Sequence, residues 1–387
     1  DKRVPVLRFK GFNDDWAQRE LRELANIGDG LHGTPTYIDN SKYFFINGNN
    51  LVNDKIRITS ETKKISFSQL SKSDKALNNL TLLMSINGTI GQLAFYNGEN
   101  IKLGKSIAYI IFHSKNNFEF FYGVLKTPNI QRYFQRHVTG TTIKNLGLAE
   151  LRNFKYPIPS EKEQEKIGKT IILINKIIVL QQRKAKQLKL LKKAMLQMLY
   201  TKEYIPSLRF MEFSTKWNLV KLGDVTYRYD NLRQPVIASQ RTHGKIPYYG
   251  ANGIQDHVDG YTHKGKFLLI AEDGANDIHN YPVKYVDGKI WVNNHAHVIQ
   301  SMPDKVDDIF LLNAIKIINM QPYLVGGSRA KLNADVMNKI PIKLPTLQEQ
   351  KDIGSLAYHL DKLIKLCLSK NSQLQSAKQF LLQNMFI

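Results

Sequence analysis

The chain contains one module twice, and this duplication constrains its architecture more than any other feature of the sequence. The segment Val4–Phe9, followed by Trp16, returns in the second half of the chain as Ile205–Phe210, followed by Trp217 at the same spacing. A second match has a shorter constant offset. The residues of the first copy are Pro159, Glu163-Gln164 and Ile167-Gly168, and they return in the second copy as Pro345, Glu349-Gln350 and Ile353-Gly354. Between these shared ends, residues 25–140 show no evident match with residues 226–325.

Shared ends with different middles indicate two copies that keep a common frame and carry two different inserts. The frame then holds the architecture or docks a partner, while each insert has a function of its own. Drift of the inserts after a duplication is the alternative explanation.

Each copy ends in a long helical pattern that follows a proline-rich stop. Ser160 and Thr346 are good N-cap residues, and Glu163 and Glu349 stand three positions later, as in a capping box. We assign heptad positions d and a to residues 167 and 171 and to every seventh residue after each of them. These positions form the seam that would face a partner helix, and eight of the ten seam residues in the first helix are apolar. The matching positions of the second helix are also apolar in eight of ten cases.

The two similar seams predict that the helices pair as a coiled coil. About 40 residues at ~1.5 Å each make a rod of roughly 60 Å. Antiparallel pairing would place one insert at each end of this rod, and a compact bundle with stacked inserts is the alternative. We expect Gln181 and Asn371 to set the register, and the one cysteine, Cys367, to be buried in the seam.

The composition is that of a folded and strongly basic protein. The 387 residues include 55 Lys and Arg against 33 Asp and Glu, a formal net charge of +22, and 42% of them are hydrophobic. A single cysteine excludes a disulfide framework and a cysteine-based zinc site. The longest apolar run is far shorter than the roughly 20 residues of a membrane span, and the first residues do not resemble a signal peptide. We therefore expect a soluble, cytoplasmic protein with no membrane partner.

The positive charge is spread over both copies. Residues 1–159 and 160–200 carry net charges of +9 and +7, whereas residues 201–345 and 346–387 carry +4 and +2. This distribution is typical of a long footprint on a polyanion. The basic run 183–193 on the first helix is a candidate phosphate track, with an ordinary solvated helix face as the alternative.

The inserts predict mixed α/β domains, because short β-rich runs alternate with Asn-Gly and Asp-Gly turns. Each insert ends in a glycine-bearing basic stretch, residues 137–146 and 325–332, in which Thr142 aligns with Ser328. Glycine allows the backbone to approach a ligand closely, and hydroxyl and basic side chains offer donors to phosphates and base edges. An ordinary loop at a helix entry is the alternative.

No complete active site is recognisable in the sequence. The stretch Gly98–Ser106 resembles a phosphate-binding loop, but it has five residues where the motif needs four. Asp54, Glu61 and Lys63 resemble the carboxylate set of a metal-dependent nuclease, although such triples are common by chance.

A metal site is also not predicted. His295 and His297 lie two residues apart, and Glu272-Asp273 is near them in sequence. A metal needs three or four directed ligands, so structural or base-contacting histidines are the stronger interpretation.

The repeated motifs together resemble the specificity (S) subunit of type I restriction-modification systems, over essentially the whole chain. The most specific matches are the openings at Leu7–Phe9 and Leu208–Phe210 and the helix entries at Pro157–Gln164 and Pro341–Gln350. The inserts also resemble target-recognition domains of this family, through four segments: Ser85–Gly91, Pro247–Gly253, Glu272–Ala275 and Asn293–His297.

The resemblance implies an α+β fold. Two mixed α/β target-recognition domains, residues 1–159 and 201–345, are then joined by two long spacer helices, residues 160–200 and 346–387. The helices are expected to form an antiparallel coiled coil, and the internal duplication is expected to be pseudo-twofold. Each domain would read one half of a bipartite target in double-stranded DNA.

The resemblance also implies the partners. Two methyltransferase (M) subunits are expected to dock to the repeated regions, and restriction (R) subunits are expected to join through the complex. This chain would then be non-catalytic and hold no cofactor, because S-adenosylmethionine, ATP and Mg are expected only on the partner subunits.

We call the two glycine-bearing stretches, residues 137–146 and 325–332, the first and second junctions. On this interpretation we predict DNA contacts from ten residues: Thr142, Lys144 and Asn145 at the first junction, Ser328, Arg329 and Lys331 at the second, and Tyr248, Asn252, Lys264 and His295 in the second insert. The basic residue is shifted by one position between the junctions, because Ile143-Lys144 aligns with Arg329-Ala330. A nuclease that uses Asp54, Glu61 and Lys63, and a protein–protein scaffold, are the alternative functions.

Overall fold

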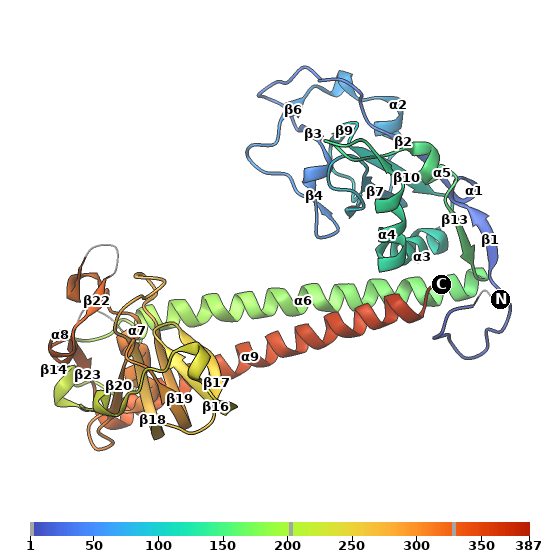
Figure 1. Cartoon of the computed structure of the whole chain (residues 1–387). Helices are drawn as coiled ribbons and strands as arrows, with labels where there is room; N and C mark the ends of the chain where they lie inside the picture. Colours follow the sequence, from blue (N-terminus) through green and yellow to red (C-terminus); the bar gives the residue numbers. More distant parts are fainter. Residues whose placement is uncertain (1–3, 201–203, 327–329) are drawn as a thin grey trace. The chain divides into compact units, whose positions relative to one another are not determined.

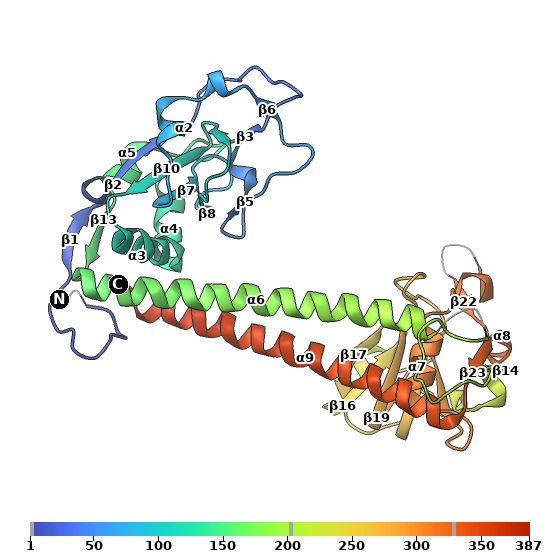
Figure 2. The same cartoon turned by 180° about the vertical axis from the view of Figure 1, so that it is seen from behind.

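The computed structural model describes residues 4–200, 204–326 and 330–387 (Figures 1 and 2). The chain divides into two compact units: unit 1 contains the residues up to 181 together with 370–387, and unit 2 contains residues 182–369. Each unit therefore combines one insert with parts of both long helices. Among the described residues, no helix is both long enough and apolar enough to cross a membrane.

The long helices are α6 (Glu161–Leu199) and α9 (Leu347–Asn384), which begin at the predicted positions. All the predicted seam positions of both helices are buried or half-buried, and Cys367 is buried as expected. The predicted capping boxes are wrong in their glutamate half, however. Thr346 does act as the N-cap of α9, because its hydroxyl accepts a hydrogen bond from the Glu349 amide at 3.4 Å. The carboxylates of Glu163 and Glu349 bind the guanidinium groups of Arg8 and Arg209 instead.

Unit 1 contains a four-stranded antiparallel sheet in the order β2-β10-β7-β8. A smaller three-stranded sheet, β6-β3-β9, lies in the same insert, and β1 pairs with β13 where the insert meets α6. The elements of the insert are β1 (Ala17–Glu20), α1 (Leu21–Leu24), β2 (Ala25–Asp29), β3 (Tyr43–Ile46), β4 (Leu51–Val52), β5 (Lys55–Ile56), β6 (Lys64–Ile65), α2 (Lys72–Ala76), β7 (Thr81–Ser85), β8 (Leu93–Phe95), β9 (Ile101–Leu103), β10 (Ile107–Phe112), α3 (Lys115–Lys126), α4 (Pro128–Arg136), β11 (Val138–Thr139), β12 (Asn145–Leu146), α5 (Leu148–Arg152) and β13 (Lys155–Ile158).

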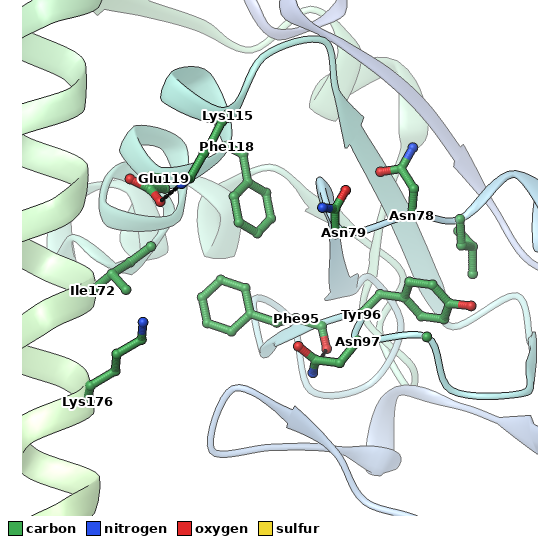
Figure 3. A pocket seen from close by; sticks show the side chains of 12 residues that line it. Asn78, Asn79, Phe95, Tyr96, Asn97, Lys115, Phe118, Glu119, Ile172 and Lys176 are labelled. Carbon is green, nitrogen blue, oxygen red and sulfur yellow. Dashed lines mark hydrogen bonds and ion pairs between the residues drawn. The ribbon is translucent and has the colours of Figure 1, made fainter.

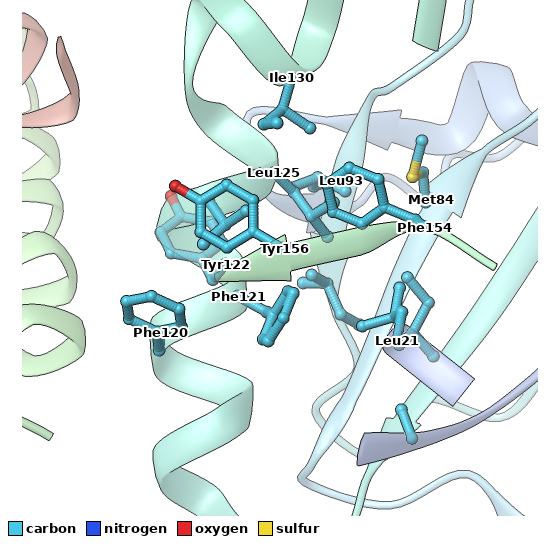
Figure 4. Close-up of a cluster of buried hydrophobic side chains, with 14 of the residues drawn as sticks. Leu21, Met84, Leu93, Phe120, Phe121, Tyr122, Leu125, Ile130, Phe154 and Tyr156 are labelled. Carbon is cyan, nitrogen blue, oxygen red and sulfur yellow. The ribbon is translucent and has the colours of Figure 1, made fainter. Parts of the chain in front are cut away.

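The core of unit 1 is rich in aromatic side chains that α3 presents to the sheet. Figure 4 shows Phe120, Phe121 and Tyr122 of this helix beside Phe154 and Tyr156. Ser114 caps the helix by accepting a hydrogen bond from the Asn117 amide, which fixes where the aromatic run begins. The C-terminal segment completes this core, because the ring of Phe386 lies 5.5 Å from that of Phe120.

Unit 2 contains a six-stranded sheet in the order β15-β20-β18-β19-β16-β17, in which β16 and β19 are parallel and the other pairs are antiparallel. One face packs against α7 and the ends of the long helices, and on the other face the apolar side chains of β18, β19 and β20 form a second cluster. The elements are β14 (Asn218–Lys221), β15 (Thr226–Arg228), β16 (His243–Gly250), β17 (Gly253–Val258), β18 (His263–Ala271), β19 (Val283–Val292), β20 (Ala296–Ser301), α7 (Asp308–Lys316), β21 (Leu324–Val325), β22 (Lys331–Leu332), α8 (Ala334–Asn338) and β23 (Pro341–Leu344); six short 3-10 helices, η1 to η6, complete the described part of the chain, and η4 (Asp230–Leu232) bears on the site below.

The two inserts share a sheet core, which corrects the expectation that their middles do not match. The order β2-β10-β7 in unit 1 corresponds to β15-β20-β18 in unit 2. At the edge, Ala17 pairs with Ile158 and Asn218 pairs with Leu344, so the register agrees with the two sequence offsets. The duplication therefore extends through the inserts, and the differences are confined to what is added around a common core.

An aromatic triad at the base of each insert repeats in the same way. In unit 1, Trp16 lies 5.6 Å from Phe120, which also contacts Phe386. In unit 2, Trp217 lies 5.7 Å from Phe310, which contacts Tyr200 at 4.9 Å. Each insert is therefore closed by a residue that follows the end of one long helix.

Candidate DNA interface

The first predicted junction forms a hairpin on the edge of unit 1. β11 and β12 pair through Val138 with Leu146 and Thr139 with Asn145. Thr142 and Lys144 are exposed on this hairpin, and Asn145 is half-buried. The structure therefore brings the three predicted residues of the first junction together on one small, accessible element.

This hairpin rests on the turn that follows β7. The Leu146 amide donates to the Ile86 carbonyl at 2.8 Å, and the Gly88 amide donates to the Lys144 carbonyl at 2.9 Å. Asn87 and Asn145 form an isolated antiparallel bridge between them. Gly88 has a φ of 72°, which is strained for a residue with a side chain, so the turn depends on glycine.

The second junction forms an equivalent hairpin in unit 2. β21 and β22 pair through Leu324 with Leu332 and Val325 with Lys331. Two of its predicted contacts, Ser328 and Arg329, lie outside the described residues. Lys331 is described, and its side chain is 48% exposed.

The second hairpin rests on the turn after β18 in the same geometry. The Leu332 amide donates to the Glu272 carbonyl at 2.7 Å, and Asp273 forms an isolated bridge with Lys331. Gly274 has a φ of 65°, close to the 72° of its counterpart Gly88. The segments Ser85–Gly88 and Ala271–Gly274 are therefore equivalent.

Sequence reasoning missed this pair of turns, although a signal for it exists. The two segments are related by the same offset that relates the helix entries. Both contain two leucines and a glycine at matching positions, from 82 to 88 and from 268 to 274. The turn residues Asn87 and Asp273 belong beside the junction residues as candidates for DNA contact.

A cluster of charged side chains lies under the second hairpin. Glu272 accepts hydrogen bonds from Arg233 at 2.6 Å and from Lys331 at 2.9 Å. Asp230 lies 2.7 Å from the Nδ1 atom of His297, which is itself 1% exposed. Four segments that are distant in sequence thus meet at one edge of the sheet.

These contacts shift the pKa values of both carboxyl groups. Burial acts to raise the pKa of Asp230, but hydrogen bonds from His297 and the Val298 amide, together with the charges of His297 and Arg233, lower it below its ordinary value. Burial likewise acts to raise the pKa of Glu272. The hydrogen bonds from Arg233 and Lys331 help to outweigh this effect, so the pKa lies below its ordinary value. Both side chains are therefore ionised at neutral pH.

Two further predicted residues contact the same turn. Asn252 donates from its amide nitrogen to the Gly274 carbonyl at 2.8 Å and accepts from the Asn276 amide at 3.0 Å. His295 lies 2.5 Å from Asp273 through Nδ1, and its side chain is 37% exposed. Asn252 and His295 therefore gather with Lys331 around the turn 272–276.

Lys264 is not part of this group. It is exposed at the start of β18, where it lies opposite Lys289 in β19. The turn follows the other end of β18, at Ala271, so about seven residues of strand, or roughly 23 Å, separate the two.

The prediction of a DNA contact from Tyr248 is wrong, because this side chain belongs to the core. Its ring is 1% exposed and carries the Arg241 guanidinium 4.1 Å from its centroid. Its hydroxyl bonds to both the amide and the carbonyl of Val236, at 3.0 and 3.3 Å. The sequence of one β-rich run does not reveal which of its alternate residues face inward. Here Tyr248 faces inward, and its hydroxyl fixes the loop before β16 through Val236.

The groups considered for catalysis have other roles in the structure. Gly98–Ser106 leads into a strand, β10, whereas a phosphate-binding loop leads into a helix. The Asp54 carboxylate lies 2.5 Å from Lys126 and accepts hydrogen bonds from Tyr122 and Asn175. Through these contacts Asp54 joins the β4–β5 turn to α3 and α6.

An open cavity of about 780 Å³ in unit 1 lies between β8, α3 and α6. Figure 3 shows the rings of Phe95 and Phe118 at its centre and Glu119, the one acidic residue drawn, beside Lys115. It contains no paired carboxylates of the kind that general acid–base chemistry uses. Among the described residues, no group of three or more His, Cys, Asp or Glu side chains is arranged to hold a metal ion.

Comparison with known proteins agrees with this architecture. The family model described as type I restriction modification DNA specificity domain matches residues 13–190 and 214–376. A putative type I restriction enzyme specificity subunit of Haemophilus influenzae, S.HindORF215P, is 44% identical over 145 residues, which are 38% of this chain and 37% of that protein. The putative MjaX specificity subunit of Methanocaldococcus jannaschii is 25% identical over 397 aligned positions, which cover 95% of this chain and 91% of that protein.

Solved structures show the same fold. The S subunit of a type I restriction-modification system from M. genitalium superposes with a TM-score of 0.70 at 17% identity, over 99% of both chains. A chain from a structure of a type I R-M system in assembly and conformational transition gives a TM-score of 0.52 at 13% identity, over 97% of this chain and 98% of that chain. Because the family model matches most of the sequence in two copies, the chain belongs to the family of type I restriction-modification DNA specificity subunits.

Proposed function

We propose that this chain selects the DNA target of a type I restriction-modification complex. Its two target-recognition domains, residues 1–159 and 201–345, each read one half of a bipartite site in double-stranded DNA. The observation that carries this proposal is the duplicated hairpin on a glycine turn, with Lys144 exposed on one copy and Lys331 half-exposed on the other. Basic and amide side chains on such an element suit hydrogen bonding to phosphates and base edges.

The two long helices act in this proposal as an antiparallel coiled-coil spacer. In unit 1, Lys378 of α9 donates to Asn175 of α6 at 2.7 Å, and in unit 2, Lys192 of α6 donates to Asp361 of α9 at 2.6 Å. The step forward along α6 from Asn175 to Lys192 equals the step back along α9 from Lys378 to Asp361. This common register supports antiparallel pairing with a pseudo-twofold relation between the copies.

The proposed docking surface for the methyltransferase (M) subunits lies on the sides of these helices that face away from the seam. Large apolar side chains are exposed there, and exposed apolar surface is typical of interaction sites. They are Leu173, Val179, Leu180, Leu190, Leu191 and Met198 of α6 and Tyr358, Leu363, Leu366, Leu368 and Phe380 of α9.

Catalysis is assigned to the partners in this proposal. The M subunits would bind S-adenosylmethionine and methylate adenine, and the restriction (R) subunits would use ATP and Mg to translocate and cleave DNA. This chain contributes target selection and geometry, and no catalytic residue or cofactor.

Deleting one heptad from each helix tests the spacer. Residues 182–188 and 365–371 are matched in the antiparallel register, so their joint removal keeps the seam and shortens each helix by about 10 Å. We expect methylation mapping in cells that carry the variant with its M subunits to show unchanged half-sites and an unread gap altered by about three base pairs.

The unaltered chain, expressed from the same vector, is the control for this mapping. An unread gap of the same length in the variant would contradict the spacer role. Methylation at unrelated sequences would contradict the proposal that the inserts alone read the half-sites.

A further inference from the structure

Asn87 and Asp273 are equivalent residues of the turns that follow β7 and β18. Each forms an isolated antiparallel bridge with the hairpin that rests on its turn. The residue before each of them, Ile86 or Glu272, donates its amide hydrogen to the loop before β10 or β20 at 2.9 Å and accepts a hydrogen bond from the hairpin at 2.8 or 2.7 Å. The backbone is therefore bound on both sides of this position, which is the preorganisation that a recognition residue needs.

The side chains at this position are bound to equivalent loops through one polar atom each. The Nδ2 atom of Asn87 donates to the Lys105 carbonyl at 3.3 Å, and the Oδ1 atom of Asp273 lies 2.5 Å from Nδ1 of His295. Asn87 is half-buried, and the Asp273 side chain is 25% exposed. Within the described residues, the amide oxygen of Asn87 and the second carboxylate oxygen of Asp273 have no hydrogen-bond partner. Each turn thus offers an acceptor that is positioned through the other polar atom of the same group.

The two side chains match different bases. Besides the hydrogen given to the Lys105 carbonyl, the Asn87 amide has one more donor hydrogen and an acceptor oxygen. This pair is complementary to adenine, whose N6 amine donates and whose N7 atom accepts in the major groove. The Asp273 carboxylate only accepts hydrogen bonds when ionised, which suits the N4 amine of cytosine. Guanine O6 and N7 and thymine O4 are acceptors themselves, so a carboxylate disfavours both bases.

The charges around the two turns differ in the same sense. A carboxylate near DNA phosphates is repelled unless a cation lies beside it. Asp273 bridges Lys331, whose Nζ atom binds the adjacent carboxylate of Glu272. Asn87 is uncharged and bridges Asn145, which is also uncharged. The acidic turn is therefore accompanied by a cation of its own hairpin, and the neutral turn by a neutral residue.

We infer that this shared turn position determines specificity in both target-recognition domains: Asn87 selects an adenine in the first half-site, and Asp273 selects a cytosine in the second. The inference rests on the proposed function and deepens it, because it assigns one base of each half-site to one residue. The hairpin then holds the turn in place, and the turn reads the base.

Exchanging the two residues tests this assignment. The full chain with its M subunits carries either Asn87→Asp or Asp273→Asn, and its target is read by methylation mapping. We expect Asn87→Asp to replace one adenine of the first half-site by cytosine, and Asp273→Asn to replace one cytosine of the second by adenine, with all other bases retained. In titrations of the same complexes with duplexes that differ only at this base pair, each variant should prefer the new base by about ten-fold.

The same chemical exchange at a second pair of turns is the matched control. Asn97→Asp and Asp287→Asn also alter residues that precede a glycine with positive φ. Both lie away from the reading turns, because Phe95 pairs with Leu82 near the start of β7 and Asp287 pairs with Lys266 in the first half of β18. These variants should retain the target of the unaltered chain.

Replacement by alanine keeps the inference testable if an exchanged variant does not fold. Asn87→Ala removes the side chain without adding a charge, so the complex should bind duplexes with any base at that one position of the first half-site about equally. Asp273→Ala should relax one position of the second half-site in the same way.

Two results of the titrations would overturn the inference. One is a base preference that is unchanged in folded variants, and the other is a preference that changes at several positions or in the opposite half-site. If the unaltered chain and its M subunits methylate no bipartite sequence, the proposed function itself fails.

Discussion

Two buried ion pairs at equivalent positions anchor the inserts to the long helices. Arg8 binds both carboxylate oxygens of Glu163 at 2.7 and 2.8 Å, and Arg209 binds those of Glu349 at 2.8 and 2.7 Å. Both glutamates are fully buried. The sequence showed that all four residues repeat, but it predicted a local role for the glutamates at the helix start. Their partners lie far away in the chain, and a local motif does not reveal a partner at such a distance.

Removing one carboxylate should be costly because it leaves a guanidinium buried without its partner. We expect Glu349→Ala to lower the free energy of unfolding by about 3–5 kcal/mol, measured by denaturant titration. Glu165→Ala is the control, since it removes an exposed pair with Lys169 on α6 and should leave the free energy of unfolding nearly unchanged. Similar losses of unfolding free energy in the two variants would show that the buried pair stabilises the fold no more than the exposed pair does.

Among the elements, the helices were predictable and the shared sheet was not. The starts of α6 and α9 follow local signals, namely a proline-rich stop, a capping residue and a heptad pattern. The equivalence of β7 and β18 is weak in sequence because a buried strand needs apolar side chains and not identical ones. Met84 and Ile270, for example, occupy the same place. For the same reason the site could be predicted only in part: the junction hairpins follow from the repeat, whereas the burial of Tyr248 and the partners of His297 depend on the folded sheet.

Gly168 shows how closely the insert of unit 1 approaches α6. A Cβ atom at this position would lie 2.7 Å from the Cβ atom of Glu119 and 2.9 Å from the backbone nitrogen of Phe120. We therefore expect Gly168→Ala to separate α6 from α3 and to lower the free energy of unfolding by about 1–3 kcal/mol in thermal or denaturant melts.

Gly33→Ala is the matched control, because nothing lies within 4 Å of the added carbon. It should leave stability nearly unchanged. If Gly168→Ala were equally harmless, the close approach of α3 to α6 would be unnecessary for the fold.

At the scale of the whole molecule, the net charge of +22 is unequally divided between the copies. The first copy, with its helix, carries +9 and +7, whereas the second carries +4 and +2. In the second insert, several basic side chains are also neutralised by nearby acids, as Lys331 and Arg233 are by Glu272. The first half of the molecule therefore presents more uncompensated positive charge to a polyanion.

This asymmetry predicts a difference in salt dependence between the two half-sites. Each phosphate that a basic group neutralises adds to the slope of log affinity against log salt concentration. We expect the duplex with only the first half-site intact to show the steeper slope between about 50 and 200 mM salt. A fully scrambled duplex gives the non-specific slope for comparison, and equal slopes for the two half-sites would contradict the charge argument.

The division into units also sets an order for synthesis. Unit 2 is one continuous stretch, residues 182–369, so its chain is complete before the last part of α9 is made. Unit 1 needs residues 370–387, and Phe386 reaches its partner Phe120 only after the whole second insert has been translated. Because synthesis proceeds from the N-terminus, the insert that is made first is the last to have its core completed. Trp16 and Phe120 lack the ring of Phe386 throughout translation of the second copy.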